Sequence, residues 1–343
     1  MNQKLFKLLD EIENNTSPSE NKHSRVLLID ALNLFFRNFS MLNMVNPNGS
    51  HIGGLGGFLR SLGYLIKEIQ PTSVYIIFDG VGSTINRKNI LPEYKSGRNI
   101  HRITNWEVFD NLEEEDDSKI DQISRLIQYL KLIPVKTISI DRSEADDIIA
   151  YLSKYLEKKH NSSVFIVSND RDFLQLITNK ITVYRPTERE YYNPERIKEK
   201  FNILHSNFLL YKTLLGDSAD KIEGIKGLGE KGILKRFPEL SNQKLILEDL
   251  FQISEKKLKE HIIYARIIQD ENKLKNNYKI MDLSNPFIGD DEINQLNNIV
   301  ESKVPDLHAV EFVNLYNEDN LGAIIRNIDI WLKDNFTILT SYK

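Results

Sequence analysis

Short apolar runs that end near acidic residues form the clearest pattern along this chain. There are four, each with β-branched side chains: Arg25–Ile29 before Asp30, Val74–Phe78 before Asp79, Val135–Ile140 before Asp141, and Val164–Ser168 shortly before Asp170 and Asp172. Runs of this kind predict buried strands of a parallel sheet. Because open α/β sheets bind ligands at the edge formed by the carboxyl ends of their strands, we expect these acids to converge there.

Helical periodicity fills the intervals between the runs, over residues 57–69, 120–132, 145–158 and 173–177. The alternation predicts an α/β fold with a mainly parallel central sheet flanked by helices. We expect a polar lead over residues 1–23 with a short helix at Leu5–Ile12, an α/β domain over 24–186, and a mainly helical domain over 187–343. From about 83 to 118 the periodicity weakens, which predicts an insertion at the edge of the sheet.

Composition narrows the classes of function. The 343 residues leave room for two domains with a core each. The lack of cysteine excludes disulfides, thiolate metal sites and cysteine nucleophiles. The chain has no apolar run of about 18 residues, so we expect no membrane span. The net charge of −4 is only an average, because basic residues gather in two places that could meet nucleic acid. These are Arg87, Lys88, Lys95, Arg98 and Arg102, and Lys221, Lys226, Lys231, Lys235 and Arg236.

Three carboxylates open the helix that begins at Ala145. Glu144 and Asp147 are three residues apart and should share a face, with Asp146 offset toward the end of the strand. Helix capping alone would explain each acid separately. Carboxylates crowded at one edge, however, repel one another unless cations lie among them, which favours a metal site. Oxygen ligands without thiols favour Mg²⁺ or Mn²⁺.

Glycines recur every two or three residues between Gly224 and Gly232, just after Asp217 and Asp220. This spacing predicts a hairpin between two helices, over about 208–240, whose backbone amides can approach a DNA phosphate. The earlier stretch Gly53–Gly57 leaves two interpretations open, a close approach to DNA or a flexible loop. The seven histidines form no close pair at metal-ligand spacing, so we expect them at the surface or in packing.

Taken in order, these motifs resemble the flap endonuclease and 5′-3′ exonuclease family, specifically its stand-alone phage members of the phage ribonuclease H type. The resemblance covers about Val26 to Phe237. It departs from the bacterial pattern in the longer spacing from Asp79 to Arg87 and in Val81, where a lysine is frequent. The motifs are Asp30 with Arg37 seven residues later, Phe78-Asp79-Gly80, Arg87 followed by Glu93-Tyr94-Lys95 and Arg98, Glu144-Ala145-Asp146-Asp147, Asn169-Asp170-Arg171-Asp172, and Gly216 to Gly232.

The resemblance implies a PIN-like 5′-nuclease fold with a helix–hairpin–helix C-terminal region. It implies a structure-specific 5′-nuclease that hydrolyses phosphodiester bonds by a two-metal mechanism, on DNA with 5′ flaps, nicks or RNA primers, during replication or repair. The segment 83–118 would form an arch over the site. We expect a cytoplasmic monomer, in the host cytoplasm if phage-encoded, with a replication protein as a partner of the C-terminal region.

Residue roles follow from the same resemblance. Asp146, with Lys95 and Arg98 to steady phosphate charge, would be catalytic. The expected metal ligands are Asp30, Asp79, Glu144 and Asp146 for one ion and Asp170, Asp172, Asp217 and Asp220 for the second, with Asp147 in support. The expected DNA contacts are Arg37, Arg87, Tyr94, Lys95, Arg98, Lys226, Gly227, Gly229, Lys231 and Gly232, with K⁺ at the hairpin.

Two other interpretations remain open. A PIN-type ribonuclease would also gather acids at a parallel sheet, although the helix–hairpin–helix and the Asp217/Asp220 pair argue against it. A nuclease-like protein that binds DNA structures without cleaving them would belong to a different functional class. The intact set of nine acids argues against this second alternative.

Overall fold

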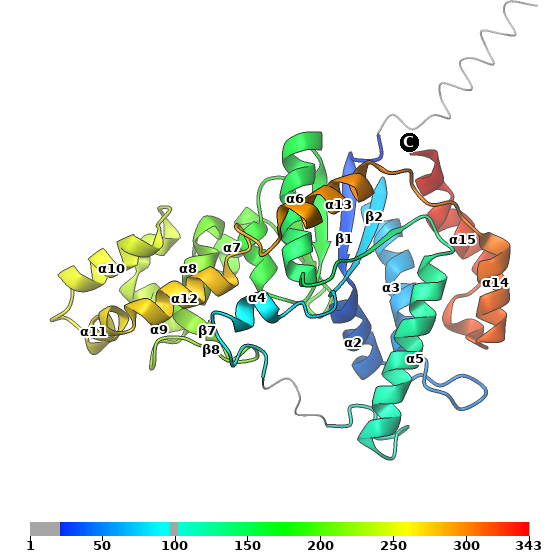
Figure 1. Cartoon of the computed structure of the whole chain (residues 1–343), viewed down its shortest axis with the longest axis horizontal. Coiled ribbons are helices and arrows are strands. Elements are labelled where there is room, and N and C mark those ends of the chain that lie inside the picture. The colour runs from blue at the N-terminus through cyan, green and yellow to red at the C-terminus, as the bar shows by residue number, and fades with distance from the viewer. Residues whose placement is uncertain (1–20, 97–101, 343) are drawn as a thin grey trace, which may run out of the picture.

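A six-stranded sheet forms the centre of the molecule (Figure 1). The computed structural model describes residues 21–96 and 102–342. The order across the sheet is β3-β2-β1-β4-β5-β6, with the first five strands parallel and β6 antiparallel to β5. All four predicted strands are confirmed, whereas β5 and β6 were not predicted. The strands are β1 Arg25–Asp30, β2 Ser73–Phe78, β3 Lys136–Ser139, β4 Ser163–Val167, β5 Ile181–Arg185 and β6 Glu190–Tyr192.

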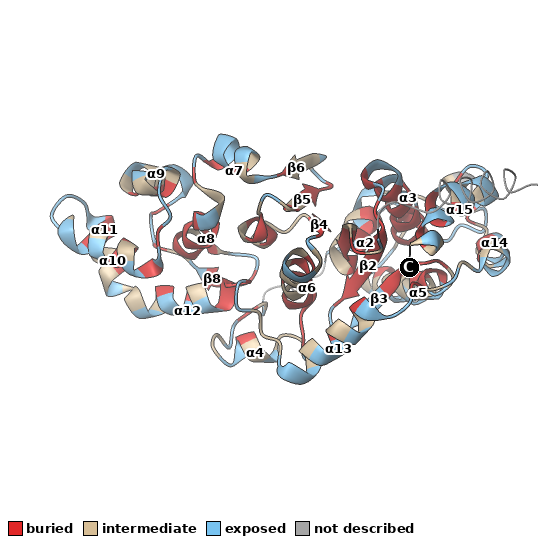
Figure 2. Ribbon diagram, turned by 90° about the horizontal axis from the view of Figure 1, so that it is seen from above, coloured by how far each residue is buried: buried red, intermediate tan, exposed pale blue. Residues whose placement is uncertain are grey.

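The alternation of side chains along the strands divides the interior into two apolar clusters. In β1, Val26 and Leu28 face one cluster, and Leu27 and Ile29 face the other, as the period of two in a strand requires. Helix α6 (Ala145–His160) covers the first face. Helices α2 (Ala31–Met41), α3 (Gly53–Ile69) and α5 (Leu112–Leu130) cover the second. The predicted α/β fold, with a mainly parallel sheet flanked by helices, is therefore confirmed, and Figure 2 shows its buried core in red on both sides of the sheet.

The glycine-rich stretch Gly53–Gly57 is helical, so the interpretation as a flexible loop was wrong, whereas an approach to DNA stays a prediction. It forms the buried first turns of α3, which packs closely against α2. A Cβ atom at Gly54 would lie 2.6 Å from the Phe35 ring, and one at Gly57 would lie 2.8 Å from the Asn38 side chain. These glycines therefore allow two helices to meet at short range.

Several element boundaries differ from the predictions. Helix α2 was missed, and α5 begins at Leu112, inside the expected arch segment. The predicted helix after β4 is a 3₁₀ turn, η1 (Asp172–Leu176). The helix expected at Leu5–Ile12 and residues 97–101, with Arg98, lie outside the described residues. The rest of the expected arch segment holds a short helix, α4 (Ile85–Lys88).

Beyond β6 the described chain is mainly helical, as predicted. One group of helices extends to the side of the sheet (Figure 1), and its apolar residues continue the cluster under α6. Helix α13 then passes near α6, and α14 and α15 pack on the face covered by α3 and α5. The helices are α7 Pro194–Phe201, α8 Phe208–Leu215, α9 Glu230–Arg236, α10 Leu247–Lys256, α11 Ile262–Gln269, α12 Glu271–Met281, α13 Asp290–Glu301, α14 Ala309–Glu318 and α15 Ile328–Phe336.

The two ends of this helical part are therefore anchored in different places. Trp331 of α15 packs on Gly63 of α3, where a Cβ atom would lie only 2.2 Å from the indole nitrogen. The domain boundary near residue 186 stays a prediction. Within the described chain, no helix combines the length and the apolar character that crossing a bilayer would require.

Candidate metal-dependent active site

The carboxyl ends of β1, β2 and β4 are tied together by their own acids. Asp30 ends β1 and caps α2, accepting a hydrogen bond from the Asn33 amide at 3.2 Å. Its second oxygen accepts one from the Ser168 hydroxyl, just beyond β4, at 2.9 Å. Asp79 follows β2 and accepts the Ala145 amide at the start of α6 at 2.8 Å. The first turns of α2 and α6 thus lie at one edge of the sheet, where the sequence predicted that the acids would converge.

Asp30 and Asp146 lie close enough to other acids of this edge for the charges of those acids to raise their pKa values. Burial, together with the charges of Asp79 and Asp170, raises the pKa of Asp30 to about 7 despite its hydrogen bonds. Burial and the neighbouring acids Asp170 and Asp30 also raise the pKa of Asp146 well above its usual range, although Lys95 opposes them. Within the described chain, no three of these acids bring oxygens within 4.8 Å of one another. Carboxylates that repel one another are expected to stay apart in this way.

Glu144 is the contact point between α6 and the arch segment. Its Oε2 atom accepts the Tyr94 hydroxyl at 3.1 Å and pairs with the Lys95 ammonium at 3.0 Å and with Arg87 at 3.0 Å. Its Oε1 atom is buried and has no hydrogen-bond partner. A buried carboxylate oxygen left unpartnered is costly. This oxygen is therefore available as a ligand for a cation.

Asp147 lies on the same face of α6 as Glu144, as their spacing predicted, but it points toward a different partner from Asp146. Both of its oxygens are held by the buried guanidinium of Arg87, at 2.6 and 2.9 Å, and one also accepts the Phe287 amide at 3.1 Å. We therefore correct the prediction for Asp147, which balances Arg87 and offers no free oxygen to a metal. Asp146 instead lies among the other acids of the edge.

Two residues predicted to contact DNA are buried. Arg87 is 3% exposed and also donates to the Ile280 carbonyl at 3.0 Å. Burial alone would lower the pKa of Arg87, but the charges of Asp147 and Glu144 outweigh burial, so the pKa is raised overall. Tyr94 is also 3% exposed, with its hydroxyl on Glu144. The prediction of direct DNA contact does not fit either side chain, because both are fully engaged inside the protein.

Lys212 is a charged residue of the site that the sequence analysis missed. It lies in the otherwise apolar helix α8, is 4% exposed, and bridges Asp172 at 2.8 Å and Asp217 at 2.7 Å. Burial and Asp170 raise the pKa of Asp172 to about 7, despite Lys212. For Asp217, burial acts in the opposite direction, but Lys212 lowers the pKa. A lone lysine in the sequence Phe208–Leu215 was the available signal, because an unpaired charge is not expected inside an apolar helix.

The helix–hairpin–helix segment adjoins this edge. Helices α8 and α9 flank it, and between them β7 (Gly216–Asp217) pairs with β8 (Ile222–Glu223). The Asp220 carbonyl accepts the Lys95 amide at 3.1 Å, which joins this segment to the arch segment. Asp220 itself is buried. The two basic segments predicted from the sequence are thus neighbours in space.

The tip of the hairpin faces solvent. Lys226, Gly227, Gly229 and Lys231 are exposed, and Gly232 is half-buried in α9. Gly227 has a φ of 80°, a backbone conformation in which glycine is favoured. The tip of the hairpin is therefore accessible to an anionic ligand, and the contacts of these residues with DNA stay a prediction.

Arg37 lies apart from the hairpin, beside the carboxyl end of β5. Its guanidinium donates to the Pro186 carbonyl at 3.2 Å and lines a cavity of about 520 Å³ together with Arg60 and Arg189.

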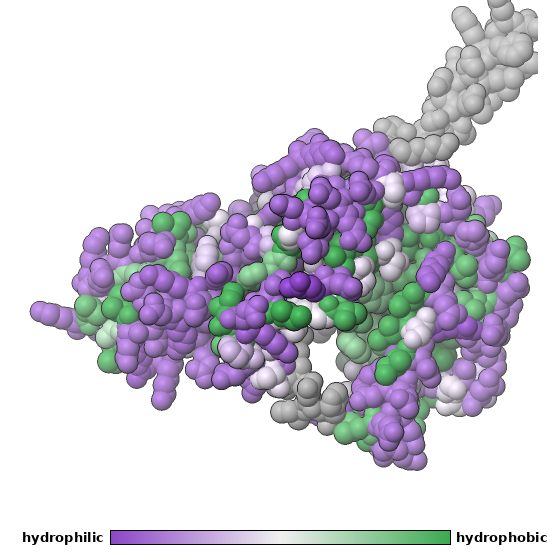
Figure 3. Space-filling model, in the orientation of Figure 1, coloured by the Kyte–Doolittle hydropathy of each residue, from purple (hydrophilic) through white to green (hydrophobic). Residues whose placement is uncertain are grey.

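In Figure 3 the surface is hollowed between the segment of α4 and helix α5, below the sheet edge. The predicted basic contacts come from three segments: Arg37 lies in α2, Lys95 in the arch segment and Lys231 in α9.

The carboxylate oxygens gathered at this edge of the sheet are suitable ligands for a hard divalent cation. The nine predicted carboxylates outnumber the cations that form ion pairs with them, which include Arg87, Lys95 and Lys212. Carboxylate oxygens without a thiol or a histidine at this edge suit Mg²⁺ and Mn²⁺. A cation bound at this edge would give the Oε1 atom of Glu144 a partner and would oppose the burial and the neighbouring charges that raise the pKa values of Asp30 and Asp146.

The raised pKa of Asp30 predicts how the stability of the metal-free protein depends on pH. The folded pKa of about 7 lies above the usual 3.8, so between these values the folded state binds more protons than the unfolded state. The free energy of unfolding in EDTA should therefore fall as pH rises from about 4 to 7. In urea titrations at pH 8, the free energy of unfolding of Asp30→Asn should exceed that of the wild type by up to about 4 kcal/mol, and the two values should converge near pH 4. Equal pH dependence of both proteins would contradict this.

Comparison with known proteins agrees with this geometry. The sequence model described as "5′-3′ exonuclease, N-terminal resolvase-like domain" matches residues 25–202. The chain is 30% identical over 246 residues to DNA polymerase I of Bacillus subtilis, covering 70% of this chain but 26% of that protein. It thus spans about a quarter of the length of this polymerase. It is also 30% identical over 234 residues to the 5′-3′ exonuclease of Buchnera aphidicola, covering 68% of this chain and 76% of that one.

The fold has a counterpart among solved structures. The flap endonuclease of bacteriophage T5, solved in a complex with DNA and metal ions, superposes with a TM-score of 0.61 at 21% identity. The superposition covers 85% of this chain and 99% of that one. The predicted PIN-like 5′-nuclease fold is thereby confirmed. Together with the sequence matches, this leads to one conclusion: the chain belongs to the 5′-3′ exonuclease family.

Proposed function

We propose that this protein is a structure-specific 5′-nuclease that hydrolyses phosphodiester bonds in DNA, as a 5′→3′ exonuclease and flap endonuclease. The observation that carries the proposal is the meeting of Asp30, Asp79, Glu144, Asp146 and Asp170 at one sheet edge, with Lys95 among them. Carboxylates gathered in this way hold divalent ions, and a neighbouring cation can bind a phosphate. The family membership supports the same activity.

The residues divide into three roles. Asp30, Asp79, Asp146 and the free Oε1 of Glu144 would hold one ion, and Asp170, Asp172, Asp217 and Asp220 would surround a second, with Lys212 setting the charge balance of that group. Two bound divalent ions would supply an activated water and stabilise the leaving oxygen of an in-line displacement. Asp147 supports the site indirectly, by neutralising Arg87 beside Glu144.

Lys95 is the phosphate-binding group that this structure supports best. Its ammonium group pairs with Glu144, and its charge lowers the pKa of Asp146, so this residue of the arch segment reaches the acids of the sheet edge. Fixed cationic donors at the place where charge develops stabilise the transition state of phosphoryl transfer. By family resemblance Arg98 would share this role.

A cleavage assay on matched substrates tests the proposal. The full chain is incubated with 5′-labelled flap DNA, nicked duplex, RNA-primed duplex and single-stranded RNA, each with Mg²⁺ or with EDTA. We expect cleavage of the flap, nicked and primed substrates with Mg²⁺ only, and weak cleavage of the single-stranded RNA. Preference for the single-stranded RNA would favour a PIN-type ribonuclease, and binding without cleavage would favour a non-cleaving DNA-binding protein.

The exposed hairpin would hold the duplex by its phosphates, which gives position and little sequence preference. Replacing Lys231 with alanine should weaken duplex binding at every sequence and reduce the slope of log K against log salt by about one. Fluorescence anisotropy between 50 and 200 mM salt, in Ca²⁺ to prevent turnover, measures that slope. Lys333→Ala, an exposed lysine on α15, is the matched control. An equal slope in both variants would remove Lys231 from the contacts.

We further propose the finer assignments that go with this activity. Mg²⁺ or Mn²⁺ would occupy the acidic edge, and K⁺ would bind between the hairpin and a DNA phosphate. The protein would act as a monomer in the cytoplasm, removing RNA primers as well as DNA ends. A replication protein would bind the C-terminal region.

A further inference from the structure

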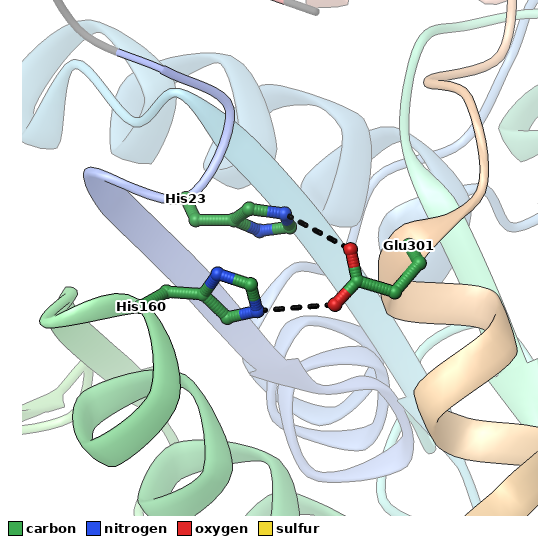
Figure 4. Close-up of side chains that lie close together, drawn as sticks. All are labelled: His23, His160 and Glu301. Carbon is green, nitrogen blue, oxygen red and sulfur yellow. Dashed lines mark ion pairs between the residues drawn. The ribbon is translucent and has the colours of Figure 1, made fainter.

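Two histidines and a glutamate meet at the opposite edge of the sheet from the acidic site (Figure 4). His23 lies just before β1, His160 ends α6 shortly before β4, and Glu301 ends α13. Their ligand atoms all lie within 4.8 Å of one another, the only such group of metal-binding side chains in the described chain. The pairing could not be read from the sequence, because the two histidines are 137 positions apart and only the fold brings them together.

The two imidazoles lie face to face and point toward one carboxylate. Their ring centroids are 4.0 Å apart with an interplanar angle of 28°. The His160 Nε2 atom is 3.2 Å from Oε1 of Glu301, and the His23 Nε2 atom is 4.0 Å from Oε2. In Figure 4 both rings direct this nitrogen to the same side. The arrangement presents two nitrogens and one oxygen to a common point.

Each ring has one buried nitrogen without a hydrogen-bond partner, Nε2 in His160 and Nδ1 in His23. His23 is 6% exposed. A neutral imidazole has a lone pair available on one nitrogen. The unpartnered nitrogen of His160 is the one that faces Glu301, so a ligand bound there would complete its bonding, whereas in His23 it is Nε2, and not the unpartnered Nδ1, that faces Glu301.

We propose that His23, His160 and Glu301 form a binding site for a borderline transition metal ion, with Zn²⁺ as the natural occupant. Zinc bonds to histidine nitrogen and carboxylate oxygen at about 2.0–2.2 Å in tetrahedral geometry, which places ligand atoms roughly 3.3 Å apart. The 4.0 Å separation between His23 Nε2 and Glu301 Oε2 is within an ångström of that value, and His160 Nε2 lies 3.2 Å from the other oxygen of the same carboxylate, Oε1. A water molecule would complete the fourth position, since the described chain provides three ligands here.

This site differs in chemistry from the acidic edge. Imidazole ligands favour Zn²⁺, Cu²⁺ and Ni²⁺, whereas a site built from carboxylates alone favours Mg²⁺ and Mn²⁺. Its place at the start of β1 and at the ends of α6 and α13 makes it a cross-link between three segments. The expected role is therefore structural, and it does not depend on the proposed nuclease activity.

The positive charges around the site set its affinity. Lys159 pairs with Glu301 Oε1 at 2.8 Å and is the nearest competitor of a metal ion. Lys22 and Lys136 donate to backbone carbonyls at the end of α13, and their charges also act on His23. The Glu301 Oε2 atom faces His23 and is the oxygen left for the ion. Removal of Lys159 should therefore increase metal affinity.

Copper spectroscopy provides a test that does not depend on activity. The tag-free full chain, saturated with Mg²⁺ to occupy the acidic edge, receives one equivalent of Cu²⁺. Electron paramagnetic resonance should show coupling to two nitrogens. His160→Ala should remove at least one of them, whereas His308→Ala, an exposed histidine on α14's N-terminal side, should change nothing. Absence of nitrogen coupling in the wild type, or its full retention in His160→Ala, would overturn the proposal.

A zinc titration against a chromophoric chelator, with Mg²⁺ present, gives the affinities. Loss of a residue that hydrogen-bonds to a metal ligand typically weakens metal affinity by about 10–100-fold, and loss of the ligand itself should weaken it at least as much. We therefore expect the zinc affinity of His160→Ala and of Glu301→Gln to be lower than that of the wild type by about tenfold or more. Lys159→Met should bind more tightly than the wild type. Zinc should raise the melting temperature of the wild type, and of Lys159→Met more, with little effect on Glu301→Gln. Equal zinc affinity in all four proteins would overturn the proposal, even if one histidine variant folds poorly.

Discussion

Replacing Asp146 with asparagine is expected to reduce DNA cleavage in Mg²⁺ by about 10³-fold or more, which corresponds to roughly 4 kcal/mol of lost transition-state stabilisation. The reason is its position: Asp146 lies among Asp30, Glu144 and Asp170, where its charge is opposed only in part by Lys95. The amide keeps the size of the side chain but loses the anionic oxygen. Single-turnover cleavage of a 5′ flap measures the effect.

Folding and DNA binding provide the controls for this variant. Asp146→Asn should bind flap DNA within a few-fold of the wild type in Ca²⁺. It should also unfold at a higher temperature in EDTA at pH 8, because burial and neighbouring acids raise the pKa of Asp146. Asp334→Asn, which removes an exposed carboxylate on α15, should leave cleavage unchanged. Full cleavage by Asp146→Asn would remove this residue from the metal ligands.

Replacing Arg87 with methionine is expected to destabilise the protein by about 3–5 kcal/mol, the usual loss when one partner of a buried ion pair is removed. The guanidinium is 3% exposed and holds both Asp147 and Glu144. Without it, two carboxylates remain buried beside one another. Urea unfolding at pH 7.5 gives the free energy of unfolding of both proteins.

Two comparisons separate this structural role from DNA contact. Lys88→Met changes an exposed residue of the same short helix and should leave stability unchanged. The double variant Arg87→Met/Asp147→Leu should regain part of the lost stability, because apolar residues often replace a buried ion pair without loss. If Arg87→Met were as stable as the wild type and only bound DNA more weakly, the assignment of Arg87 to the buried network would be wrong.

The acidic edge could be predicted because it depends on short-range signals. Each apolar run contains the residues of its own strand, and parallel strands must end at the same edge, so the position of Asp30 and Asp79 followed from the pattern alone. The three-residue spacing of Glu144 and Asp147 likewise gave their shared face. Such inferences need only the geometry of one element and the order of the next.

The partners of these acids could not be predicted in the same way. Arg87 and Lys212 reach their carboxylates through contacts between segments that no local period encodes. The β5–β6 pair was missed because its short strands carry Thr182, Arg185 and Glu190 among the apolar residues. Gly53–Gly57 looked like a loop because glycine disfavours helices, yet close packing of α3 on α2 outweighs that preference.

The hydrogen bonds from Arg87 to the Ile280 carbonyl and from the Phe287 amide to Asp147 connect the acidic edge to the end of α12 and the chain that follows it. A shortened protein that stops near residue 202, where the family match ends, would keep every predicted metal ligand except Asp217 and Asp220. It would nevertheless leave Arg87 and Asp147 each without one of their anchors. Cutting the chain near residue 202 is thus a poor route to a minimal enzyme, since the residues that follow support the acidic edge.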